Sequence, residues 1–132
     1  MIEVELSRII IDEAKREQII VLREKNGSKT LPIVIGLTEA LAVRMKLSGF
    51  IPPRPLTHDL MKSLFDALEV RLEKIVIDKL VDSTFHAKLF LITKEGTKIV
   101  DARPSDSIAL AVRTNSPMFV EEEVFRRLEQ GL

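Results

Sequence analysis

Two short stretches of the chain hold the side chains that could do chemistry. The first reads Arg54-Pro55-Leu56-Thr57-His58-Asp59 and lies at the start of an expected helix. A neighbouring histidine and aspartate at a helix start could supply a general base or a metal ligand. The alternative is that Thr57 caps the helix, Asp59 interacts with the helix dipole and His58 lies exposed. The spacing alone leaves both interpretations open.

The second stretch reads Asp101-Ala102-Arg103-Pro104-Ser105-Asp106 and continues into a nearly all-apolar helix. Pro104 suits a first helical turn, which places Asp106 near the positive end of the helix dipole. Asp101 and Asp106, together with a third acid, could hold Mg²⁺ or Mn²⁺. Arg103 could bind a phosphate through two parallel hydrogen bonds. The alternative is a helix start with an Arg–Asp ion pair.

Two further titratable residues stand apart from these stretches. Glu39 lies in the first turn of another expected helix, where it either interacts with the dipole or projects into a shared site. His86 lies on the outward face of an expected strand, and we expect it to be exposed.

Several kinds of chemistry are excluded by what the chain lacks. It has no cysteine, no HExxH zinc motif and no glycine-rich phosphate loop, and Ser105 and Ser107 lack the G-x-S-x-G context of a hydrolase nucleophile. Lysine plus arginine and aspartate plus glutamate number 20 each, so no net charge draws the protein to nucleic acid. Tryptophan and tyrosine are absent, which leaves six phenylalanines as the aromatic surfaces on which bases could stack.

The size and composition predict one globular domain over residues 1–132. Hydrophobic residues make up 45% of the chain, enough for a single sizeable core. No apolar run approaches the roughly 18 residues that span a bilayer, and the N-terminus lacks the pattern of a signal peptide. We therefore expect a cytoplasmic protein without a membrane partner.

Hydrophobic periodicity predicts two similar sets of elements. Strands at about 2–11, 18–23 and 30–35 lead into a buried helix over 38–48 with Thr38 as its cap, and Asp12–Glu17 forms a polar turn. Strands at about 70–80, 85–92 and 98–101 lead into the helix that opens at Pro104. A proline-rich connector and a helix from Thr57 to about Glu69 lie between the sets, and a short strand and a helix follow them.

The two sets indicate an internal duplication. Ala40-Leu41-Ala42-Val43-Arg44 recurs as Ala109-Leu110-Ala111-Val112-Arg113, and Gly27-Ser28-Lys29 matches Gly96-Thr97-Lys98 in the same register. We interpret residues 2–48 and 70–115 as a duplicated strand-strand-strand-helix unit, with a helical insert at 49–69 and a terminal strand and helix at 116–131. The predicted fold class is α+β, with a largely antiparallel sheet packed with helices.

The alignment of the two repeats distinguishes the polar residues of the second stretch from their counterparts in the first repeat. It aligns Val34-Ile35-Gly36-Leu37 with Arg103-Pro104-Ser105-Asp106, so the polar cluster stands in one copy only. A repeat kept purely for folding has no reason to differ in that way, which favours a function for the cluster.

Both stretches resemble motifs of the bifunctional nuclease domain family. The similarity includes Leu31-Pro32-Ile33-Val34-Ile35-Gly36 followed by Glu39, and it covers roughly residues 2–125. Plant members of that family are described as degrading both DNA and RNA. The resemblance implies functional positions at Glu39, Arg54, His58, Asp59, Asp101, Arg103, Ser105 and Asp106.

The leading hypothesis is a metal-dependent nuclease. Mg²⁺ or Mn²⁺ would be held by Asp59 and Asp106 with Glu39 or Asp101, and His58 would act as general acid or base beside the two aspartates. The groups that steady the substrate would be Arg54, Thr57, Arg103 and Ser105. The alternative is a non-catalytic, oligomeric binding or regulatory module that recognises a small anion or a protein. In either case we expect self-association, with a dimer as the default.

Overall fold

The computed structural model describes residues 1–12, 14 and 16–131, which form seven strands and four helices. Part of the turn expected at 12–17 lies outside these described residues. The elements, in chain order, are β1 (Ile2–Asp12), β2 (Glu17–Glu24), β3 (Thr30–Ile35), α1 (Leu37–Leu47), α2 (Thr57–Ala67), β4 (Arg71–Val81), β5 (Thr84–Thr93), β6 (Gly96–Ala102), α3 (Pro104–Thr114), β7 (Met118–Val120) and α4 (Glu122–Glu129).

All seven strands belong to one sheet, in the order β3-β2-β1-β7-β4-β5-β6. Neighbouring strands are antiparallel except for β4 and β7, which are parallel. The predicted α+β class with a largely antiparallel sheet is therefore confirmed. The three-residue strand β7 connects the two halves, because it pairs with β1 on one side and β4 on the other.

The edge strand β3 follows directly from its sequence. Its side chains alternate between exposed and buried, with Leu31, Ile33 and Ile35 facing the core. Pro32 and Val34 point the other way and are exposed. A proline removes one ladder hydrogen bond, which suits the position of β3 at the edge of the sheet.

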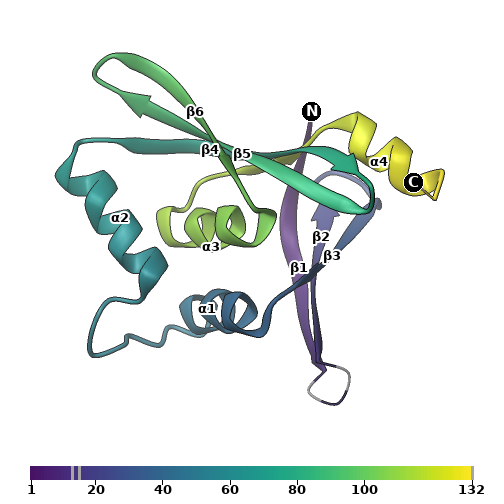
Figure 1. The fold of residues 1–132 in the computed structure, drawn as a ribbon, viewed down its shortest axis with the longest axis horizontal. Helices are drawn as coiled ribbons and strands as arrows, with labels where there is room; N and C mark the ends of the chain where they lie inside the picture. The colour runs from purple at the N-terminus through teal and green to yellow at the C-terminus, as the bar shows by residue number, and fades with distance from the viewer. Residues whose placement is uncertain (13, 15, 132) are drawn as a thin grey trace.

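Helices α1 and α3 each pack on a different half of the sheet. Helix α1 contacts β1 and β2, whereas α3 contacts β4 and β5, and the two helices pack side by side (Figure 1). Helix α2 packs against α3, and α4 packs against β4. The apolar residues of α3 are buried, as its sequence predicts, apart from the half-buried Val112.

Two details of the helix starts differ from the predictions. Neither Thr38 nor Thr57 caps its helix, because the capping positions are held by Gly36, two residues before Thr38, and by Leu56, one residue before Thr57. Helix α1 is also only half-buried. Leu41 and Leu47 keep 38% and 56% of their surface exposed, since the main contacts of α1 in the described residues are with the sheet and with α3.

The two halves share the element order strand-strand-strand-helix, and their common ancestry stays a prediction. Their helices, however, are offset from the repeated pentapeptide, because Ala40 is the fourth residue of α1 and Ala109 the sixth residue of α3. Counted from each helix start, Glu39 and Asp106 occupy the same third position. An acid therefore stands at this position in both halves, so the polar cluster is not confined to one of them.

Candidate active site at three helix starts

A cavity of about 450 Å³ lies where the first turns of three helices converge. At the helix starts it is lined by Thr38 and Glu39 of α1, Thr57 and His58 of α2, and Asp106 of α3 with Arg103 at the N-cap of that helix. Leu89 of β5 and Val100 of β6 contribute apolar wall. Because the start of a helix carries a partial positive charge, three of them at one cavity favour an anionic ligand.

Asp106 is the centre of the polar groups in this cavity. Its Oδ1 lies 2.9 Å from Nε2 of His58, and its Oδ2 accepts a 2.9 Å hydrogen bond from Nε of Arg103. Nη2 of Arg103 reaches on to Oε1 of Glu39, at 3.2 Å. Burial raises the pKa of Asp106, but the hydrogen bonds from Arg103 and His58 outweigh burial and hold that pKa below its usual value. Asp106 is therefore a carboxylate at neutral pH.

His58 is oriented by this carboxylate. It is 8% exposed, so the alternative of a surface histidine is wrong. With Asp106 ionised, the chemistry of the pair assigns the proton to Nε2, which leaves Nδ1 able to accept one. A histidine whose tautomer is set by a carboxylate can serve as a general base.

Asp59 faces away from this group of residues and takes part in a different one. It accepts a 2.8 Å hydrogen bond from Nε of Arg113 and a 3.0 Å hydrogen bond from the backbone N–H of Leu56. Burial raises the pKa of Asp59, but the hydrogen bonds from Arg113 and Leu56 lower it by more. The pKa of Asp59 therefore lies below its usual value. Through these hydrogen bonds Asp59 links α2 to α3 and stabilises the start of its own helix.

Sequence reasoning overlooked Arg113. It is 4% exposed and also donates to the carbonyl oxygens of Ala109 and Ala42, at 3.0 and 3.1 Å. The signal was present in the sequence, because an arginine within a nearly all-apolar helix needs a buried acceptor.

The remaining predicted residues lie at the edge of the site or beyond it. Asp101 lines the cavity but is exposed and pairs with Nζ of Lys88 at 2.9 Å, which lowers the pKa of its carboxyl. Thr57 lines the cavity from an exposed position, and Arg54 is exposed in the segment before α2. Ser105 is buried but lines a neighbouring cleft.

The four predicted metal ligands do not converge. Within the described ranges, no group of three or more histidine or acidic side chains is placed to hold an ion. Arg103 stands between Glu39 and Asp106, whereas Asp59 and Asp101 are paired with other cations. In this arrangement a metal ion would have to displace Arg103 to reach two carboxylates together, and metal binding stays a prediction.

The fold and the site define an α+β domain with an acid–base pair in an anion-favouring cavity. The model of the bifunctional nuclease domain matches residues 20–131, and the chain belongs to this family.

Relatives fall into two groups. An uncharacterized protein of Mycobacterium tuberculosis is 44% identical over 122 residues, which is 92% of this chain and 73% of the relative. Bifunctional nuclease 2 of Oryza sativa is 31% identical over 119 residues, and Bifunctional nuclease 1 of Arabidopsis thaliana is 26% identical over 115 residues. The match covers 86% and 84% of this chain but only 36% and 35% of those two plant proteins.

In the described part of the chain, none of the helices combines the length and the apolar character needed to cross a membrane.

Proposed function

We propose that this protein hydrolyses phosphodiester bonds of nucleic acid in the cavity at the three helix starts. The observation that carries the proposal is the 2.9 Å contact between His58 and Asp106 beside Arg103. Membership of the bifunctional nuclease domain family supports the same chemistry. The plant relatives that bear the name of a nuclease are much longer than this chain, so their substrates are carried over here as part of the proposal.

His58 would exchange the proton of the reaction. Held by Asp106, its ring accepts a proton from water as the water oxygen attacks phosphorus, and the bond from phosphorus to the leaving oxygen breaks. The imidazolium then returns a proton to the leaving oxygen, so the ring ends in its starting state. Asp106 stabilises the charged ring between these two steps.

Arg103 would steady the phosphate. Its Nε and Nη2 are engaged by Asp106 and Glu39, so Nη1 is the part of the guanidinium that remains for a substrate oxygen. The side chain is 65% exposed and reaches solvent at the cavity mouth. The partial positive charges of the three helix starts add to this stabilisation as charge develops on the phosphate oxygens.

Metal dependence is a further part of the proposal. Three acids line the cavity, and Asp101 is paired with Lys88. Glu39 and Asp106 could bind Mg²⁺ or Mn²⁺ together if Arg103 moved to the phosphate. A bound divalent ion would supply Lewis-acid stabilisation of the attacked phosphate.

The test is cleavage of labelled single-stranded DNA and RNA by the purified protein with Mg²⁺, with Mn²⁺ or with a chelator. We expect His58→Ala and Asp106→Asn each to reduce the rate by about 100-fold or more, as removal of a general base does. The matched controls are His86→Ala and Asp66→Asn, which lie outside the cavity and should keep the wild-type rate. Cleavage that survives both cavity substitutions would come from a contaminant and would contradict the proposal.

A second candidate is a non-catalytic module that binds a small anion. It is favoured by one observation, since the acids of the predicted site are already paired with cations of the same chain. Absence of cleavage with every metal, together with phosphate binding that Arg103→Gln abolishes, would support this candidate over the nuclease.

A further inference from the structure

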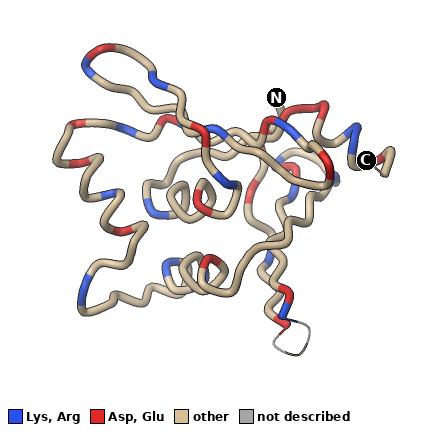
Figure 2. The backbone as a smooth tube through the Cα atoms, in the orientation of Figure 1, with Lys and Arg blue, Asp and Glu red and all other residues tan. Residues whose placement is uncertain are grey.

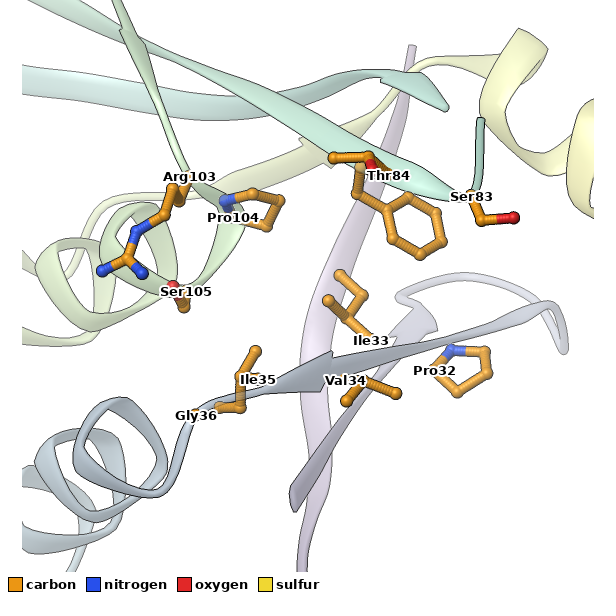
Figure 3. A pocket seen from close by; sticks show the side chains of 11 residues that line it. Pro32, Ile33, Val34, Ile35, Gly36, Ser83, Thr84, Arg103, Pro104 and Ser105 are labelled. Atoms are coloured by element: carbon orange, nitrogen blue, oxygen red, sulfur yellow. The ribbon is translucent and has the colours of Figure 1, made fainter. Parts of the chain in front are cut away.

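A second cleft, of about 430 Å³, adjoins the candidate active site. Figure 3 shows it between the end of β3 and the segment that enters β5, with Arg103, Pro104 and Ser105 at one end. Arg103 lines this cleft as well as the active-site cavity. A ligand bound in the cleft would therefore have one end beside the guanidinium that the proposed function assigns to a phosphate.

The walls of the cleft are mostly apolar. Four successive residues of β3, from Pro32 to Ile35, form one wall, and Phe85 at the start of β5 contributes an aromatic ring opposite. Phe85 is half-buried, so part of its ring packs on the core and part faces outward. An anchored aromatic ring with an open side is a surface on which a nucleobase can stack.

Hydroxyl groups lie on both sides of the cleft. Ser105, which is 6% exposed, lines it beside Arg103 and Pro104. Ser83 and Thr84 supply further hydroxyls at the opposite rim. A mainly apolar pocket with a few polar groups suits a flat heterocycle with polar edges.

From these observations we infer that the cleft holds an unpaired base of single-stranded nucleic acid, with its sugar, next to the phosphate at Arg103. The inference rests on the proposed function, because it takes its phosphate position from that site. Moving a paired base out of its stack costs free energy, because its pairing and stacking are lost. Double-stranded substrates should therefore bind less well than single strands. Both single-stranded DNA and single-stranded RNA should bind, since every base has a face that can stack on the ring.

Binding can be measured apart from cleavage by using His58→Ala protein throughout. The probe is a fluorescent single strand of about ten nucleotides, DNA or RNA, followed by anisotropy, with the matching duplex as comparison. Phe85→Leu should raise the dissociation constant by about tenfold, because stacking on an aromatic ring is lost. Phe85→Trp should keep the dissociation constant near that of the protein with Phe85, because tryptophan also offers an aromatic ring.

The chain offers a matched control for these variants. Phe90 lies on the same strand, outside the cleft, with its ring under Lys74, and Phe90→Leu should leave binding unchanged.

An abasic probe makes the assignment specific. One abasic position along the strand should weaken binding by about tenfold, and that effect should vanish in the Phe85→Leu protein. Ser105→Ala should change the preference among the four bases at that same position, because its hydroxyl contacts the base edge.

The outcomes separate this inference from the proposed function. Equal binding by the Phe85→Leu and Phe90→Leu proteins, with cleavage by the wild type intact, overturns the base subsite and leaves the nuclease standing. Binding that depends on Phe85 without any wild-type cleavage supports the subsite and overturns hydrolysis. Duplex bound as tightly as single strand also overturns the subsite.

Discussion

Three acids at equivalent positions have different roles because their surroundings differ. Glu39, Asp59 and Asp106 each occupy the third position of a helix, where a carboxylate interacts favourably with the helix start. Asp59 folds back to the N–H of Leu56, as in a capping arrangement. Glu39 and Asp106 instead meet across Arg103, and Asp106 also holds His58. The position in the helix is shared, and the neighbours decide which acid belongs to the site.

The pH dependence of stability should reveal the role of Asp59. Its pKa in the folded protein lies below the ordinary value of about 3.9. The stabilisation is therefore present above that ordinary value and lost as the pH falls through the folded one. We expect the difference in unfolding free energy between the wild type and Asp59→Asn to be largest near neutral pH and to shrink below about pH 4.

Urea unfolding at a series of pH values measures this difference. Asp66→Asn is the matched control, because Asp66 lies on the same helix and its partner Lys62 is an exposed neighbour. A wild-type advantage over Asp59→Asn that persists unchanged in acid would contradict the assignment.

At the scale of elements, Arg113 joins the three helices that form the cavity. From α3 it donates to Asp59 of α2 and to the carbonyl oxygen of Ala42 in α1. These contacts lie on the packed sides of the helices, and the converging first turns carry the candidate site. The position of His58 relative to Asp106 thus depends on a buried arginine whose hydrogen bonds go to other residues.

Replacement of Arg113 by methionine should therefore be costly. Arg113→Met keeps most of the volume but leaves Asp59 and two carbonyl oxygens without their donor, so we expect a loss of about 3–5 kcal/mol in unfolding free energy. Arg44 ends the other copy of the repeated pentapeptide and is exposed. Arg44→Met should change stability by less than about 0.5 kcal/mol. Equal effects of the two substitutions in denaturant unfolding would count against the helix-joining role.

At the scale of the whole molecule, charge is spread evenly and recognition has to be local. The formal net charge is zero at pH 7, and Figure 2 shows basic and acidic residues interspersed over the sheet and the helices. A protein of this kind does not hold nucleic acid by a broad electrostatic field. Binding would instead depend on Arg103 and on the helix starts around it.

The salt dependence of binding tests this point. Each phosphate contact to a single strand contributes about −0.7 to the slope of log K against log salt concentration. With one or two such contacts we expect a slope between about −0.7 and −1.4 for the His58→Ala protein and the single-stranded probe. Arg103→Gln should make the slope less negative than in the His58→Ala protein alone. A slope several times steeper than expected would indicate an extended basic surface and would contradict local recognition.

Much of the fold could be predicted from the sequence because its signals are local. Alternating apolar residues predict the strands, and Pro104 predicts the start of α3. The predictions of an apolar helix at α3 and of a short strand at β7 also agree with the structure. Each of these features depends on a few adjacent residues, so the sequence contains the information within one window.

The assembly of the site was decided by the tertiary structure alone. His58 and Asp106 are 48 residues apart in the chain, and Asp59 and Arg113 are 54 apart. Adjacent in sequence, His58 and Asp59 project to different partners because successive helical residues point about 100° apart. Which side chain meets Asp106 is set by how α2 and α3 pack, and that packing depends on buried contacts between distant segments. The sequence by itself determined the residues that could do chemistry, and only the packing of three helices decided which of them meet.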